Sequence, residues 1–187
     1  MPYIVQTHRL TKTIGGKHVI EDINLHIKEG EIYGFLGPNG AGKTTVMKML
    51  TNFWKPTSGE IELFGTPLTP KSYDVLKRIG TMIEFPAFYD HMTGYQNLKL
   101  HCEYIGYYKH GSIENALEML GLKDDAKKKV KDYCLGMEER LGIARAIFCK
   151  PELLILDEPT NGLDPAGMKQ IRELLKEFCF YNYGCMA

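Results

Sequence analysis

The sequence has no excess of charge of either sign and no long apolar run. Its 23 basic and 23 acidic residues cancel, so no one-sided field points to a nucleic acid or an anionic membrane as a partner. No apolar run approaches the roughly 18 residues that a membrane-spanning helix needs. The first ten residues, MPYIVQTHRL, lack the apolar core of a secretion signal. The pattern therefore favours neither a membrane span nor a secreted protein.

Cysteine is scarce, and its positions follow no binding pattern. The five cysteines are Cys102, Cys134, Cys149, Cys179 and Cys185. An odd number without a C-x-x-C pair argues against a disulfide framework or a zinc site and favours reduced thiols in a cytoplasm. The length of 187 residues fits one domain, and 44% hydrophobic with 25% charged residues is the balance of a soluble globular protein.

Hydrophobic periodicity predicts an α/β protein with a helical insertion. Strands are expected at 3–10, 19–27, 29–37, 59–65 and 153–156, and helices at 43–50, 136–149 and from 165 to about 178. In the second strand, Ile23, Leu25 and Ile27 should share one face. From 86 to about 140 the pattern is helical. The element order predicts an α/β core with an inserted helical arm.

Two helix starts are predicted inside the helical arm. Thr93 and Gln96 form a T-x-x-Q capping box. Ser112 is expected to cap a second helix, which Gly121 should end.

A phosphate-binding loop is predicted between the third strand and the first helix. The segment GPNGAGKTT satisfies G-x-x-x-x-G-K-[ST] in the required strand–loop–helix setting. Glycines let backbone N–H groups point at phosphate oxygens, and the helix presents its positive end to the anion. Its residues are Gly37, Pro38, Asn39, Gly40, Ala41, Gly42, Lys43, Thr44 and Thr45. Lys43 would reach the β- and γ-phosphates and Thr44 would hold Mg²⁺, whereas the alternative is a chance glycine turn.

Two adjacent carboxylates end the late aliphatic strand LLIL. Strand carboxyl ends meet at one edge of a parallel sheet, so Asp157 is expected to face the same Mg²⁺ as Thr44. Glu158 would orient the attacking water and accept its proton. The alternative is that the pair only caps the next helix. Asp164 and Pro165 have the pattern of an N-cap followed by the first helical residue.

Together with the segment YCLGMEERLGIARAI at 133–147, these motifs resemble the nucleotide-binding subunit of ABC transporters. The resemblance runs from Tyr3 to about Lys176 and looks like the bacitracin-resistance and lantibiotic-immunity exporter type. It implies an α/β P-loop NTPase (RecA-like) core with an N-terminal antiparallel β region and an inserted helical subdomain at about 86–140. The whole chain, 1–187, would be one ABC-type ATP-binding domain.

The resemblance also implies cofactors, partners and site residues. ATP and Mg²⁺ would be the cofactors, Glu158 the catalytic base, and the metal ligands Thr44, Glu84 and Asp157. Signature residues of one subunit would contact ATP held by the other in a head-to-tail dimer. Those residues are Cys134, Leu135, Gly136 and Met137, and the dimer-interface loop is Asn161, Gly162, Leu163 and Asp164. A separate transmembrane permease would be the partner, at the inner face of the cell membrane, with no nucleic acid involved.

Three residues depart from the family pattern. Glu84 stands where a glutamine is usual. It can still ligate Mg²⁺, or it can be a solvated loop residue. Cys134 replaces a serine, and a thiol is a weaker donor. Ile14 replaces an aromatic that stacks on adenine, and it can still contact ATP by covering the base, without a π face. The last two changes predict weaker ATP binding, each by about 1 kcal/mol.

The tail EFCFYNYGCMA is the largest departure. None of the six histidines (His8, His18, His26, His91, His101, His110) follows the acidic strand, so none matches the family's γ-phosphate histidine. We expect a truncated or frame-shifted reading of a longer gene, or else a natural short variant. Missing C-terminal strands would leave a sheet edge uncovered and make the chain marginally stable.

Three functions remain open at this point. The first is an ATPase subunit that powers export, of a peptide antibiotic or another drug, through a separate membrane subunit. The second is a nucleotide-binding remnant or regulatory module with little turnover. The third is an ABC-type protein acting on ribosomes or DNA, which the neutral charge disfavours.

Overall fold

The structure is a computed structural model that describes residues 2–107, 109–180 and 184–186. Its strands are β1 (Tyr3–Ile14), β2 (Lys17–Ile23), β3 (His26–Lys28), β4 (Ile32–Tyr33), β5 (Ser58–Leu63), β6 (Thr66–Pro67), β7 (Ile79–Met82), β8 (Leu153–Leu156) and β9 (Gly184–Met186). Its helices are α1 (Lys43–Leu50), α2 (Tyr73–Leu76), α3 (Gly94–Ile105), α4 (Ser112–Met119), the 3₁₀ turn η1 (Val130–Asp132), α5 (Leu135–Ile147) and α6 (Pro165–Phe180).

The N-terminal strands form an antiparallel sheet in the order β2-β1-β5-β6, with β3 also pairing with β1. The prediction of one strand at 19–27 was wrong, because the chain breaks between β2 and β3. Asp22 has a left-handed backbone with φ of 52°. The buried Thr7 hydroxyl accepts from the Leu25 N–H at 2.8 Å and donates to the Ile23 carbonyl at 3.0 Å. Thr7 thus satisfies the backbone groups that the break leaves unpaired.

The second sheet is parallel and has the order β4-β9-β8-β7. Every residue of β8 is buried, because both faces of this strand pack against a core. Leu153 and Ile155 join the core around α1, while Leu154 and Leu156 join the core under the helical part. A continuous aliphatic run is the pattern expected for a parallel strand covered on both faces.

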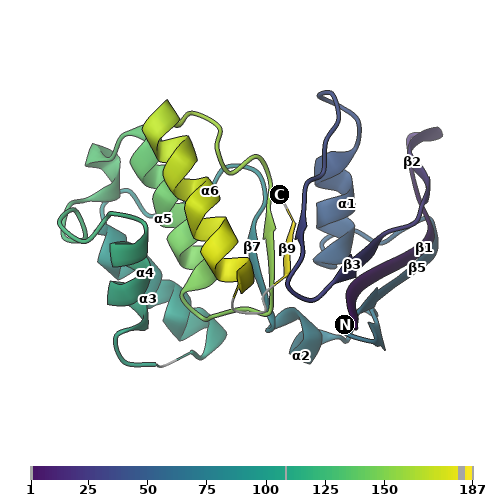
Figure 1. The fold of residues 1–187 in the computed structure, drawn as a ribbon, viewed down its shortest axis with the longest axis horizontal. Helices are drawn as coiled ribbons and strands as arrows, with labels where there is room; N and C mark the ends of the chain where they lie inside the picture. Colours follow the sequence, from purple (N-terminus) through teal and green to yellow (C-terminus); the bar gives the residue numbers. More distant parts are fainter. Residues whose placement is uncertain (1, 108, 181–183, 187) are drawn as a thin grey trace.

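The layers follow from these two cores. Figure 1 shows α5 and α6 on one side of the parallel sheet and α1 on the other, with α1 lying between the parallel and antiparallel sheets. Helices α3 and α4 lie beyond α5. The fold class predicted from the sequence is therefore observed. The limits of 86–140 for a helical subdomain stay a prediction.

The parallel sheet contains one strand that was not predicted from the sequence. After α6 the chain forms β9, whose backbone pairs with β4 on one side and β8 on the other. Over these three residues the position between β4 and β8 is filled. The strand is too short to have been recognised from hydrophobic periodicity. The final helix is also two residues longer than predicted and reaches Phe180.

Helix caps agree with most of the predicted signals. Thr93 and Gln96 form both hydrogen bonds of a capping box at the start of α3. Gly121, with φ of 65°, follows α4 as predicted, and the Leu122 N–H donates to the Leu117 carbonyl at 2.7 Å. The start of α4 differs, because Gly111 in a left-handed conformation precedes Ser112, which gives no side-chain cap.

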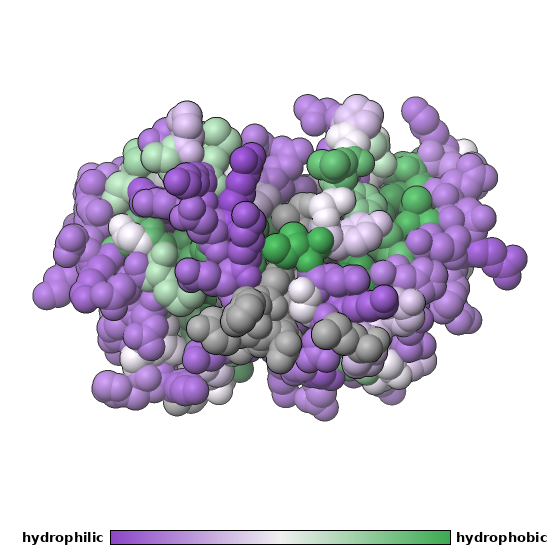
Figure 2. All heavy atoms as spheres, in the orientation of Figure 1, coloured by the Kyte–Doolittle hydropathy of each residue, from purple (hydrophilic) through white to green (hydrophobic). Residues whose placement is uncertain are grey.

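The surface is mixed in polarity. On the face seen in Figure 2, the most hydrophobic residues show over the half that holds α1 and the antiparallel sheet, while less hydrophobic residues lie among hydrophilic ones over the helical half. Among the described residues, no helix has both the length and the apolar character that a bilayer crossing requires.

Candidate functional site

The loop before α1 takes the conformation that its glycines permit. Gly40 and Gly42 have φ of 82° and 87°, in the left-handed region that side chains disfavour. A methyl group on Gly42 would lie 2.9 Å from Ile20 Cδ1 and 3.0 Å from the Val19 carbonyl. The loop therefore packs closely on β2. Lys43 Nζ donates to the carbonyls of Gly37 at 2.7 Å and Pro38 at 3.2 Å.

Thr44 and Asp157 meet across 113 positions of sequence. The Thr44 hydroxyl donates to Asp157 Oδ2 at 2.6 Å. Asp157 is held at the end of β8 because its backbone N–H donates to the Met82 carbonyl of β7 at 2.8 Å. The predicted convergence of these two side chains is therefore observed. The two side chains meet because the carboxyl ends of adjacent parallel strands lie beside the start of one helix.

A cavity of about 160 Å³ lies at this junction. Its lining residues come from α1, the segments after β7 and β8, and α5: Thr44, Glu84, Phe85, Glu139, Asp157, Glu158 and Asn161. Four of these side chains are carboxylic acids. Carboxylate oxygens gathered in this way can bind a cation or orient a water molecule. Nearby lysines must then offset the negative charge of the carboxylates.

Glu158 is fixed by both its backbone and its side chain. Its φ of 48° is unusual for a residue with a side chain. Asn161 Nδ2 donates to Glu158 Oε2 at 2.6 Å, and Lys43 Nζ lies 3.9 Å from Oε1. One carboxylate oxygen is thus oriented by an amide from the next turn, and the other faces the loop lysine.

Glu139 is a site residue that our sequence reasoning missed. It is 96% buried, since its relative exposure is 4%, and burial, helped by the neighbouring Glu138 charge, raises its pKa. Helical periodicity was the sequence feature that could have indicated that Glu139 is buried. Glu139 shares its face of α5 with Gly142, Ile143 and Ala146, which are all buried.

Glu84 lies beside the cavity and is not simply a solvated loop residue. Its backbone is left-handed with φ of 61°. Lys48 Nζ of α1 donates to Glu84 Oε1 at 2.5 Å. The carboxylate is therefore positioned by a specific cation while it lines the cavity.

The predicted signature segment lies at the start of α5 and outside the cavity. Cys134 is the N-cap residue, and its sulfur, a weak acceptor, takes no hydrogen bond from an N–H group of the first turn. The segment packs on the loop after Glu158: a methyl group on Gly162 would lie 2.5 Å from Leu135 Cδ2, and one on Gly136 would lie 3.3 Å from Leu163 Cδ2. Met137 is buried.

Asp164 caps α6 as predicted. Its Oδ1 accepts from the Gly167 N–H at 2.8 Å, and Pro165 is the first residue of the helix. The loop from Asn161 to Asp164 thus links Glu158, the signature segment and α6. Its role at a dimer interface stays a prediction.

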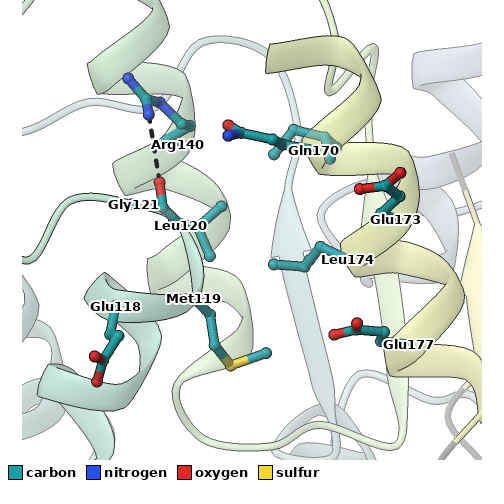
Figure 3. Close-up of a pocket in the computed structure, with 10 residues that line it drawn as sticks. Glu118, Met119, Leu120, Gly121, Arg140, Gln170, Glu173, Leu174 and Glu177 are labelled. Carbon is teal, nitrogen blue, oxygen red and sulfur yellow. Dashed lines mark hydrogen bonds between the residues drawn. The ribbon is translucent and has the colours of Figure 1, made fainter. Parts of the chain in front are cut away.

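Arg140 and Ile14 lie away from the cavity. Figure 3 shows Arg140 beside a groove of about 330 Å³ between α4 and α6, and its Nη1 donates to the Leu120 carbonyl at 3.5 Å. The consecutive residues Glu139 and Arg140 therefore line two different cavities on different sides of α5. Ile14 is exposed at the β1–β2 hairpin, where it pairs with Lys17, and its predicted contact with adenine stays a prediction.

The ligand set fits Mg²⁺ that is partly held by phosphate. Thr44 and Asp157 supply adjacent hydroxyl and carboxylate oxygens. Across the residues that the structure describes, no three His, Cys, Asp or Glu side chains are arranged to hold a metal on their own. Mg²⁺ in nucleotide sites uses one or two carboxylates and takes its other ligands from phosphates and water. The residues present meet that requirement.

Comparison with known proteins agrees with the geometry. The family model described as ABC transporter matches residues 20–161, which include the phosphate loop, the acidic pair and the signature segment. The chain belongs to the ABC transporter ATP-binding family.

Curated relatives carry related names. The chain is 61% identical over 176 residues to the uncharacterized ABC transporter ATP-binding protein YcbN of Bacillus subtilis (strain 168), covering 94% of this chain and 57% of YcbN. It is 49% identical to the bacitracin transport ATP-binding protein BcrA of Bacillus licheniformis, covering 94% and 57%. It is 39% identical to the lantibiotic transport ATP-binding protein SrtF of Streptococcus pyogenes, covering 94% and 75%. The chain thus spans little more than half the length of YcbN and BcrA.

A solved structure supports the same fold. The cbiO1 protein from Clostridium perfringens, part of the ABC transporter complex cbiONQ, matches with a TM-score of 0.84 at 28% identity. The match covers 100% of this chain and 78% of cbiO1. The resemblance to ABC ATP-binding subunits of the bacitracin and lantibiotic type is confirmed.

Proposed function

We propose that the chain binds and hydrolyses ATP as the ATP-binding subunit of an exporter for a peptide antibiotic or a similar drug. Proteins of this family are ATPases in general, and the names of BcrA and SrtF supply the kind of cargo. The observation that carries the proposal is the 2.6 Å hydrogen bond from Thr44 to Asp157 beside Glu158. This supports the proposal because the side chains of Thr44, Asp157 and Glu158 line one cavity.

Each side chain then has a defined task. The backbone N–H groups of the loop and the start of α1 bind phosphate oxygens, while Lys43 turns from the carbonyls of Gly37 and Pro38 toward the terminal phosphates. Thr44 and Asp157 would hold Mg²⁺, which supplies charge neutralisation at the phosphates when bound. Glu158, oriented by Asn161, accepts a proton from the attacking water.

The partners follow from the same proposal. A separate transmembrane subunit would carry the cargo, and the chain would lie at the inner face of the membrane. Two copies, or one copy with a related cassette, would sandwich two nucleotides. The packing of Leu135 and Gly136 on the loop at Gly162 and Leu163 supports this, because the segment that would contact the partner's ATP is tied to the loop that follows Glu158.

The variant Glu158→Gln tests the proposed hydrolysis. An amide cannot accept the proton, so phosphate release should fall by about 100-fold or more, while equilibrium dialysis shows ATP binding no weaker than in wild type. Size-exclusion chromatography with Mg²⁺ and ATP should show a dimer that persists. The matched control is Glu173→Gln on the exposed side of α6, which should behave as wild type.

Two outcomes would contradict the proposal in different ways. Unchanged phosphate release in Glu158→Gln would remove this residue as the base. ATP binding without turnover in the wild-type chain would leave the second function, a nucleotide-binding module, as the better description.

A further inference from the structure

One face of α1 carries two side chains that reach two different carboxylates. Thr44 and Lys48 are four residues apart, so they lie one above the other on the helix. Thr44 donates to Asp157 after β8, and Lys48 donates to Glu84 after β7. Because β7 and β8 are neighbouring parallel strands, α1 holds the ends of both strands with one row of side chains.

Packing against Trp54 orders the Lys48 side chain independently of its ion pair with Glu84. The Lys48 side chain is only 18% exposed, whereas that of Glu84 is 61% exposed, and Lys48 Nζ lies 5.0 Å from the centre of the Trp54 ring. The Trp54 backbone N–H donates to the Lys48 carbonyl at 3.0 Å, which ties the segment that carries the ring to the end of α1. Exposed ion pairs contribute little, partly because two long side chains must be ordered. Here the packing under Trp54 has already ordered one of them.

The charge of Glu84 adds to the negative charge around the cavity, and its pairing with Lys48 offsets that charge. The cavity is lined by the carboxyl groups of Glu84, Glu139, Asp157 and Glu158, and a nucleotide triphosphate brings further negative charge. Like charges at this range disfavour each other. Lys43 lies near Glu158, whereas Lys48 lies on Glu84. The two lysines therefore offset two of the four carboxylates that line the cavity.

We propose that Lys48 is a positioning residue: with Trp54 behind it, it holds the Glu84 carboxylate at the edge of the cavity and offsets its charge so that an anionic nucleotide can enter. This inference rests on the proposed nucleotide binding. It predicts that removal of the Lys48 ammonium weakens ATP binding only while residue 84 is a carboxylate.

A double-mutant cycle tests that dependence. Lys48→Met should weaken binding of ATP, measured by equilibrium dialysis in Mg²⁺, by about tenfold, because the Glu84 charge then opposes the phosphate charges without an ammonium to offset it. Adding Glu84→Gln to Lys48→Met should restore the affinity to within about twofold of Glu84→Gln alone. Lys77→Met, which removes an exposed lysine paired with Asp74, is the control and should change nothing. Equal losses from Lys48→Met in both backgrounds would overturn the proposal.

Trp54 supplies a readout that needs no nucleotide. It is the single tryptophan of the sequence, and its ring centre lies 5.0 Å from Lys48 Nζ and 5.9 Å from Lys12 Nζ, so its emission should change when the nearer cation is removed. Lys48→Met and Glu84→Gln should each shift this emission, because the first removes the ammonium and the second releases it, while Lys77→Met should not. Unshifted emission in both variants would overturn the ion pair. If the two variants shift the emission but the wild-type chain binds no ATP, the ion pair is supported and the proposed function is contradicted.

Discussion

Replacing Gly42 by alanine places a methyl group at the most confined point of the phosphate loop. The backbone there has φ of 87°, which costs an L-residue about 1–2 kcal/mol. The same methyl group would lie 2.9 Å from Ile20 Cδ1 and 3.0 Å from the Val19 carbonyl. The isoleucine side chain can turn aside, but the carbonyl belongs to β2 and cannot move without the strand.

The backbone cost and the packing cost add, because the first comes from the positive φ and the second from the contact of the methyl group with β2. Overpacking against a fixed strand costs about 1–3 kcal/mol. Together with the backbone term, the variant should lose about 3 kcal/mol of unfolding free energy. For a chain of this size, that loss corresponds to a fall in Tm of about 6–12 °C. Urea unfolding followed by circular dichroism measures it directly.

Gly40→Ala is the matched control, because only one of the two costs applies. Its φ is 82°, yet no heavy atom lies within 4 Å of the added methyl group. It should therefore lose about 1–2 kcal/mol, from the backbone alone. Equal losses in the two variants would refute the close packing of the loop on β2, and no loss in either would refute the left-handed backbone.

Two further predictions concern the pH dependence of stability. The pKa of Glu139 is raised by burial above its ordinary 4.5, so its contribution to stability is full below 4.5 and is lost as pH rises through the folded value. Glu139→Gln should therefore be more stable than wild type at neutral pH, with the difference vanishing at acid pH. The pKa of His101 is lowered from 6.5 by burial and by Arg145, so its contribution is full above 6.5 and is lost as pH falls through the folded value. His101→Phe, which keeps the ring contact with Phe148, should show a smaller loss of stability on acidification.

The parts of the fold that the sequence predicts well have strong local patterns. The run LLIL has no polar residue on either face, so it is a buried parallel strand at Leu153–Leu156, as observed. Thr93 with Gln96 has both partners of its cap within one turn. The meeting of Thr44 and Asp157 was predictable because a glycine loop and an acidic strand end have known places at one edge of a parallel sheet.

The remaining features depend on contacts between distant segments. The break at Asn24 is stabilised by Thr7 and by the Asn24 side chain, which accepts from the Arg9 N–H at 2.8 Å. The pair of Lys48 and Glu84 joins positions 36 apart. The strand β9 is defined by backbone pairing on both sides and carries too few residues for a periodic signal.

The most direct test of the proposed nucleotide site is the Mg²⁺ dependence of ATP binding in the variant Asp157→Asn. If Thr44 and Asp157 hold Mg²⁺ against the phosphates, wild type should bind ATP more tightly with Mg²⁺ than with EDTA. The variant should lose that difference while keeping its affinity in EDTA, since the phosphate loop is unchanged. An Mg²⁺ effect of the same size in wild type and in Asp157→Asn would contradict the account.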